Sequence, residues 1–129
     1  MRWFESSRPS SVTGAPFGDR LPRVLDAFAR GDLEEAAGCF SAEAEYREAG
    51  AEAVRGREGI AAHFARYAAA GPAWRFEVDE VVRDGDRACV VYRFLVAGGA
   101  GEPWRERAGC ATVHLDRDGL IAAWREYRG

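Results

Sequence analysis

The chain has 129 residues and a net charge of −3, from 18 basic residues, all arginine, and 21 acidic ones. This length fits one domain with a substantial core. Because basic and acidic residues are interspersed, the charge gives no reason to expect a nucleic-acid or anionic-membrane partner. Cys39, Cys89 and Cys110 have no CxxC or Cys/His metal spacing. We therefore expect reduced thiols, no metal site and a cytoplasmic protein.

The two ends of the chain differ in composition. Residues 1–18 contain Ser, Pro and Gly without a hydrophobic period, and we expect a flexible arm there, before a single domain over residues 19–129. The charged opening MRWFESSRPS argues against a secretory signal peptide, and no stretch is apolar enough to predict a membrane span.

Two short helices are expected first. Apolar residues at i, i+3, i+4 and i+7 from Leu21 predict an amphipathic helix that Asp19 caps and Gly31 ends. A second helix should begin after Asp32, because Glu35 completes a capping box three residues later.

The remainder predicts one further helix and five strands. AEYRE at 44–48 alternates like a short strand, and GREGIAAHFARYAAAG at 56–71 has a helical apolar face. Four later strands are expected over 74–82, 87–96, 103–115 and 120–127. The order α-α-β-α-β-β-β-β predicts an α+β fold in which helices cover one face of a mostly antiparallel, curved sheet.

The two Asp-Gly turns set the expected register of the last four strands. If Gly85 and Gly119 each occupy the left-handed position of a G1 bulge, Phe76 lies opposite Tyr92 and Thr112 lies opposite Trp124. Even-numbered residues should then share the face under the helices: Trp74, Phe76, Val78, Val90, Tyr92, Phe94, Cys110, Thr112, His114, Trp124 and Glu126.

The opposite face should carry more apolar residues than solvent requires. Val91, Leu95, Val113 and Ile121 are expected there. An exposed apolar patch usually marks an association surface, so we expect a homodimer through the outer face of the sheet.

Several segments resemble the nuclear transport factor 2-like superfamily, in the branch of SnoaL-like polyketide cyclases and ketosteroid isomerase-like proteins. They are FSAEAEYREAG, VRGREGIAAHF, VDEVVRDGDRACVVYRF and DRDGLIAAWREY, and the likeness covers residues 20–128. The resemblance implies a cone: a strongly bent sheet wrapped around a long helix, an apolar cavity inside, and a sheet-to-sheet dimer. Relatives include isomerases, dehydratases, epoxide hydrolases and non-catalytic proteins, so the fold alone does not define the activity.

The same resemblance suggests acidic groups. Glu48, in YRE, stands where isomerases and cyclases carry an acidic general base, and Glu126, in WRE, stands where epoxide hydrolases place a pocket acid. Those hydrolases also need an Arg and an Asp two residues apart on the adjacent strand. Tyr92 and Phe94 are the inward residues here, so the hydrolase pattern is incomplete.

The residues themselves leave alternatives. Glu48 shares a strand face with Tyr46, and is either a pocket acid or a solvated carboxylate on an edge strand. Tyr92 or His114 could stabilise a developing oxyanion, although a lone histidine is as often structural. The remaining predicted pocket residues are Tyr46, His63, Phe64, Tyr67, Trp74, Phe76, Phe94, Cys110, Thr112, Trp124 and Glu126.

These observations predict a protein that binds a small hydrophobic molecule inside the domain. No Walker loop, dinucleotide fingerprint or nucleophile elbow is present in the sequence. If the protein is an enzyme, it is expected to be a cofactor-free isomerase, cyclase or dehydratase. The alternatives are a non-catalytic binding or dimerisation module, and an interaction protein that uses the outer sheet face.

Overall fold

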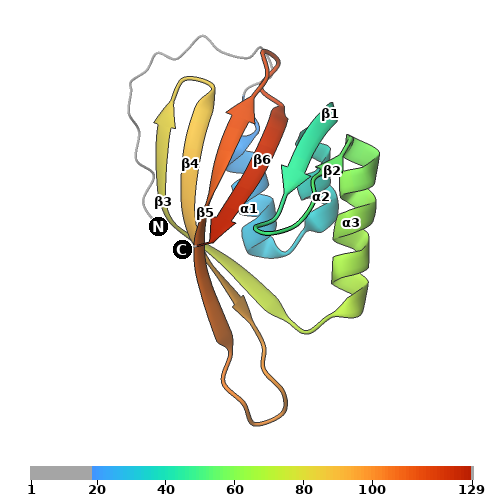
Figure 1. The fold of residues 1–129 in the computed structure, drawn as a ribbon, viewed down its shortest axis with the longest axis vertical. Coiled ribbons are helices and arrows are strands. Elements are labelled where there is room, and N and C mark those ends of the chain that lie inside the picture. Colours follow the sequence, from blue (N-terminus) through green and yellow to red (C-terminus); the bar gives the residue numbers. More distant parts are fainter. Residues whose placement is uncertain (1–18, 129) are drawn as a thin grey trace.

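The structure is a computed structural model that describes residues 19–128, and the predicted arm over 1–18 lies outside the described residues. The α+β class is confirmed (Figure 1). Its elements are α1 (Leu21–Arg30), α2 (Leu33–Gly38), β1 (Phe40–Arg47), β2 (Val54–Arg55), α3 (Arg57–Ala70), β3 (Trp74–Asp84), β4 (Arg87–Val96), β5 (Arg105–Leu115) and β6 (Ile121–Arg128).

The predicted end of α1 at Gly31 and the predicted start of α2 after Asp32 are confirmed, whereas the N-cap position of α1 is Arg20, one residue after the predicted Asp19. The Leu21 amide donates to Asp19 Oδ1 at 3.0 Å, and Gly31 ends α1 with a left-handed φ of 76°. The Glu35 amide donates to Asp32 Oδ1 at 3.1 Å, so the side chain of Asp32 caps α2.

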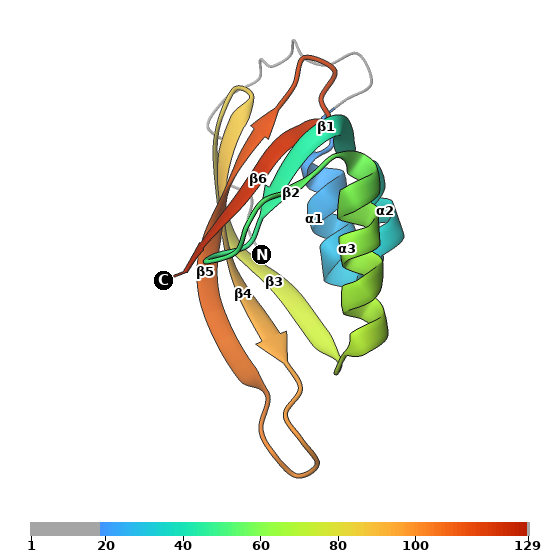
Figure 2. The ribbon, with the colours of Figure 1, turned by 45° about the vertical axis from the view of Figure 1, so that its right-hand side comes forward.

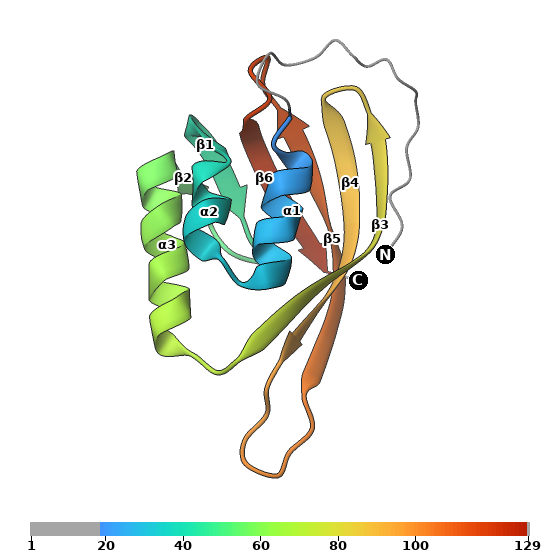
Figure 3. The same ribbon diagram turned by 180° about the vertical axis from the view of Figure 1, so that it is seen from behind.

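A six-stranded mixed sheet bends around the helices in the cone expected of the fold. The strand order is β2-β1-β6-β5-β4-β3, with β1 and β6 parallel and the other neighbours antiparallel. All three helices lie against one face of this sheet (Figures 2 and 3). β1 starts at Phe40, earlier than predicted, and the two-residue β2 was not predicted because so short a segment has no readable alternation. Within residues 19–128, no helix is long and apolar enough to cross a bilayer.

Phe28 of α1 joins the helix layer to the sheet. Its ring centroid lies 5.8 Å from that of Phe64 in α3, and 5.3 Å from both Phe76 in β3 and Trp124 in β6. Such edge-on and tilted aromatic contacts add to the stabilisation that burial alone provides. This cluster forms the floor on which the candidate site is built.

The first hairpin differs from the predicted register but retains the predicted inward face. Asp84 pairs with Arg87, so the turn contains two residues instead of a G1 bulge. A bulge at Asp79 shifts the register again, and Phe76 then lies opposite Phe94. The two shifts cancel, and the even-numbered aromatic residues of β3 and β4 still face the helices.

The second hairpin reverses the predicted face of β5. Asp116 and Leu120 form the expected turn, but Ala122 is an extra residue in β6, so His114 lies opposite Ala123. A shift of one residue turns every side chain of a strand to the other face. The predicted inward positions of Cys110, Thr112 and His114 are therefore wrong.

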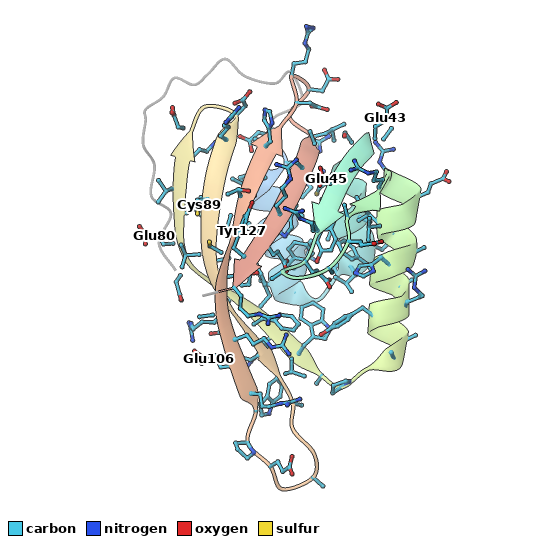
Figure 4. The ribbon with its side chains drawn as sticks, viewed as in Figure 1. Glu43, Glu45, Glu80, Cys89, Glu106 and Tyr127 are labelled. Atoms are coloured by element: carbon cyan, nitrogen blue, oxygen red, sulfur yellow. The ribbon has the colours of Figure 1, made fainter. Side chains whose placement is uncertain are left out.

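The same bulge removes two residues from the predicted association surface. Val113 and Ile121 are 3% and 0% exposed, respectively, and belong to the core. Val91 and Leu95 keep the outward positions that were predicted for them, because β4 retains its expected face. Figure 4 shows Cys89 and Tyr127 on this outer face of the sheet.

Candidate functional site

A cavity of about 390 Å³ opens between the concave face of the sheet and α3. This volume is in the range of small-molecule sites. Many of the residues that line it are aromatic, and those that form the wall between sheet and helices are Phe28, Tyr46, Phe64, Tyr67, Trp74, Phe76, Tyr92 and Phe94. The polar side chains that line it are Glu48, His63, Arg105, Arg107, Glu126 and Arg128.

The aromatic wall is packed ring against ring. Trp74 stacks on Phe94 with centroids 5.7 Å apart, and Phe76 lies 5.0 Å from Tyr92. Tyr67 of α3 contacts both Trp74 and Phe94, which closes the wall between helix and sheet. The cavity therefore offers an apolar molecule a packed aromatic surface away from water.

Glu126 is the most enclosed carboxylate of the cavity. Its Oε2 accepts a hydrogen bond from the Trp124 indole at 2.9 Å and a longer one of 3.5 Å from the Tyr46 hydroxyl. The Tyr92 hydroxyl lies near enough to this carboxyl to influence its pKa. Burial raises the pKa of Glu126, the nearby charge of Glu48 raises it further, and the polar groups of Trp124, Tyr92 and Tyr46 lower it; the net direction is upward.

Glu48 lies just beyond the end of β1 and closer to solvent, with 42% of its side chain exposed. Its Oε2 accepts from the Tyr46 hydroxyl at 3.1 Å and lies 3.0 Å from His63 Nε2 on α3. Glu48 thus lines the cavity at its edge. The deeper acid is Glu126.

The Tyr46 hydroxyl connects the two acids. It lies within hydrogen-bonding reach of both Glu48 and Glu126, and its ring is 6% exposed. Burial, followed by the charges of Glu126 and Glu48, raises the pKa of Tyr46 well above its ordinary value. A neutral phenol therefore bridges two carboxyl groups across β1 and β6.

Four predicted pocket residues do not line the cavity. Trp124 is fully buried behind the wall, where its indole holds Glu126. His114 is 48% exposed on the outer face, 3.7 Å from Asp86, and is wrong as a candidate oxyanion donor. Cys110 and Thr112 point outward with it, because of the bulge at Ala122.

The sequence reasoning missed the arginines of the cavity. Arg105, Arg107 and Arg128 line it, as do the apolar Leu33 and Val96. The alternation in RERAG did place Arg105 and Arg107 on one face of the strand, but only the correct register shows that this face is the inner one. Among residues 19–128, no three or more His, Cys, Asp or Glu side chains gather where they could hold a metal ion.

The bent sheet, with three helices on one face and a cavity between them, is the fold of a nuclear transport factor 2-like domain. Residues 21–124 match the family model of the SnoaL-like domain, and the chain belongs to that family. Among curated proteins, none matches the sequence significantly.

Solved structures agree with this fold. An epoxide hydrolase of M. tuberculosis, described as LEH-like, superposes with a TM-score of 0.70 at 19% identity, covering 84% of this chain and 75% of that one. A hypothetical Catenulispora acidiphila protein with a ketosteroid isomerase-like fold, solved with trimethylamine, gives 0.71 at 18%, covering 84% and 86%. SalBIII, an epoxide hydrolase/cyclase-like enzyme of pyran ring formation in salinomycin, gives 0.70 at 16%, covering 84% and 87%.

Proposed function

We propose that this SnoaL-like protein binds a small, mostly apolar molecule in the cavity and moves a proton on it without a cofactor. The observation that carries this proposal is the position of Glu126: an enclosed carboxyl on the wall of an aromatic cavity, with hydrogen-bond donors around it. Burial raises its pKa toward the range in which a carboxyl both takes up and returns protons.

Glu126 would act as the acid-base group. In its ionised form it would take a proton from a carbon next to a carbonyl, or from a hydroxyl group of the bound molecule. Tyr92 lies on the same wall, and burial raises its pKa, so its hydroxyl stays neutral and able to donate to an oxygen that gains charge. In this role Tyr92 would act as the sequence predicted, and Glu126 would take the place of Glu48 as the base.

Glu48 and His63 would carry protons between Glu126 and solvent. The chain of groups runs from Glu126 to the Tyr46 hydroxyl, then to Glu48, and then to His63, whose side chain is 27% exposed. Proton exchange along hydrogen-bonded side chains would reset Glu126 after each turnover without opening the cavity.

The neighbours in fold support this class of chemistry. Isomerase-like and cyclase-like proteins share the fold, and isomerisation, cyclisation and dehydration all require a proton to be moved. Epoxide hydrolysis fits less well, because Tyr92 and Phe94 occupy the inward positions of β4 where an Arg and an Asp would be needed.

The test is isomerisation of a panel of bicyclic β,γ-unsaturated ketones, followed by the ultraviolet absorbance of the conjugated product. Glu126→Gln should lower turnover by about 100-fold or more, in line with the loss of a general base. The control is Glu106→Gln, which removes the same charge from the outer face shown in Figure 4. Tight binding of these ketones without turnover in the unmodified protein would favour the non-catalytic binding module.

A further inference from the structure

The polar groups of the cavity are divided by charge. Glu48 directly follows β1, and His63 and Glu126 come from α3 and β6, whereas Arg105 and Arg107 come from the first part of β5 and Arg128 ends β6. In Figures 1 and 2 this part of β5 extends past the helices. The cavity thus has one end that carries Glu126, Glu48 and His63, and another that carries Arg105 and Arg107 and is open to solvent.

Arg105 and Arg107 lie against the aromatic wall. On the neighbouring strand, Arg105 is opposite Val96 and Arg107 is opposite Phe94, and all four residues belong to the lining. Burial raises the pKa of the Tyr67 hydroxyl, the charge of Glu48 raises it further, and the charge of Arg107 lowers it. Both charged groups therefore act on Tyr67. Apolar surface therefore continues from the arginines toward the acids.

These two arginines have no carboxylate partner among residues 19–128. Arginines on the outer face are paired instead: Arg93 with Asp79 at 3.0 Å, and Arg125 with Glu45 at 2.9 Å. Two guanidinium groups on one wall of a cavity, without an internal counter-ion, create a local site for an anion.

The spacing along β5 sets the size of a molecule that could reach both ends. Ala111 lies opposite Glu126, and Arg107 precedes Ala111 by four residues on the same strand face. Four residues of extended strand span about 13 Å. A body of two or three fused or linked rings covers such a distance once the side chains at both ends are counted.

We infer that the cavity takes an amphipathic organic anion: an apolar ring system with a carboxylate, or a similar oxyanion, at one end. Arg105 and Arg107 bind the anionic end, and the opposite end lies at Glu126. The planar guanidinium group suits this task because it donates two parallel hydrogen bonds to one carboxylate. This inference rests on the proposed function, since it needs the aromatic cavity to hold a ligand.

The test compares two fluorescent probes that share one skeleton. N-phenyl-1-naphthylamine is neutral, and 1-anilinonaphthalene-8-sulfonate carries an anionic group. Competition between them shows that both occupy the same cavity. Arg105→Gln combined with Arg107→Gln should weaken binding of the anionic probe by about tenfold, while the affinity for the neutral probe changes less than about twofold.

The matched control is Arg87→Gln combined with Arg117→Gln. It removes the same charge from two exposed arginines that are not in the cavity lining, and it should leave both probes unchanged. Circular dichroism verifies that both double variants are folded.

Four results would overturn the inference. The anion site would be refuted if the Arg105/Arg107 variant bound the anionic probe as tightly as the unmodified protein does. It would also be refuted if that variant lost affinity for both probes equally, or if both double variants lost affinity for the anionic probe equally. These results would not contradict the apolar cavity. Failure of both probes to bind the unmodified protein would refute the proposed cavity function, and the anion site with it.

Discussion

At the scale of single residues, two glutamates of the same cavity differ because their surroundings differ. Glu48 is partly exposed and contacts His63, whereas Glu126 is enclosed and accepts from Trp124 and Tyr46. Desolvation penalises the charged form of a carboxyl, and it acts more strongly on Glu126. The deeper acid is therefore the one that we propose as the acid-base group.

This burial predicts how Glu126 affects stability as pH changes. Its pKa is higher in the folded state than in the unfolded chain, so between the two values the folded state binds more protons. The stability that Glu126 contributes is fully present below the unfolded value of about 4.3, and is lost as pH rises through the folded value.

Glu126→Gln removes this titration. We expect the variant to become more stable relative to the unmodified protein as pH rises from about 4 to about 8, as measured by the free energy of unfolding. Urea unfolding followed by tryptophan fluorescence at several pH values measures it. A difference that stays constant, or that shifts in the opposite direction, would contradict the burial of this acid.

At the scale of elements, one extra residue in β6 decides the face of β5. The bulge at Ala122 directs Ala111, Val113 and Leu115 into the core and His114 outward. The bulge also pairs Gly109 with Arg128, and a Cβ at Gly109 would lie 2.8 Å from the Tyr127 carbonyl oxygen. Close packing of β5 against β6 at this point leaves room for glycine alone.

The register makes neighbouring residues of β5 respond oppositely to the same substitution. Val113→Arg places an unpaired charge in the core and should reduce the free energy of unfolding by about 4 kcal/mol or more, or prevent folding. His114→Arg changes an exposed side chain and should alter stability by less than about 0.5 kcal/mol. Chemical denaturation of both variants measures this. Equal tolerance of the two would contradict this register, and greater destabilisation by His114→Arg would mean that the strand has the register first predicted from the turns.

At the scale of the whole molecule, the outer face of the sheet carries a half-exposed apolar patch. We define it by Val82, Cys89, Val91, Cys110 and Tyr127, which lie side by side on β3 to β6. Val82 and Tyr127 are 47% and 45% exposed. The patch differs from the surface predicted from sequence, since it includes neither Val113 nor Ile121.

A homodimer through this outer patch remains a prediction. Val91→Arg places a charge at its centre, where two copies would have to desolvate it, and should convert the dimer to a monomer in sedimentation velocity. Ala61→Arg, on the exposed surface of α3, is the matched control and should not change the sedimentation coefficient. If the unmodified protein sediments as a monomer at micromolar concentration, the patch is not a dimer interface.

Local features of the sequence determined much of this protein by themselves. The caps at Asp32 and Gly31 act within one helical turn, so the residues that form them are neighbours in the chain. The aromatic residues of β3 and β4 were predicted on the inner face, and Phe76, Tyr92 and Phe94 do line the cavity. The α+β class and the family follow from the same patterns.

Only the tertiary structure decided which face of β5 is inside and which glutamate is enclosed. The bulges at Asp79 and Ala122 follow from how strands pack, and turn sequences do not show them. Because side chains alternate at every residue, one bulge places Val113 on the inner face of β5, where His114 and Cys110 were predicted. The same shift turns Arg105 and Arg107 toward the cavity. Glu126 likewise lies 3.5 Å from the hydroxyl of Tyr46, 80 residues away in the chain, and such a long-range contact has no local signal in the sequence.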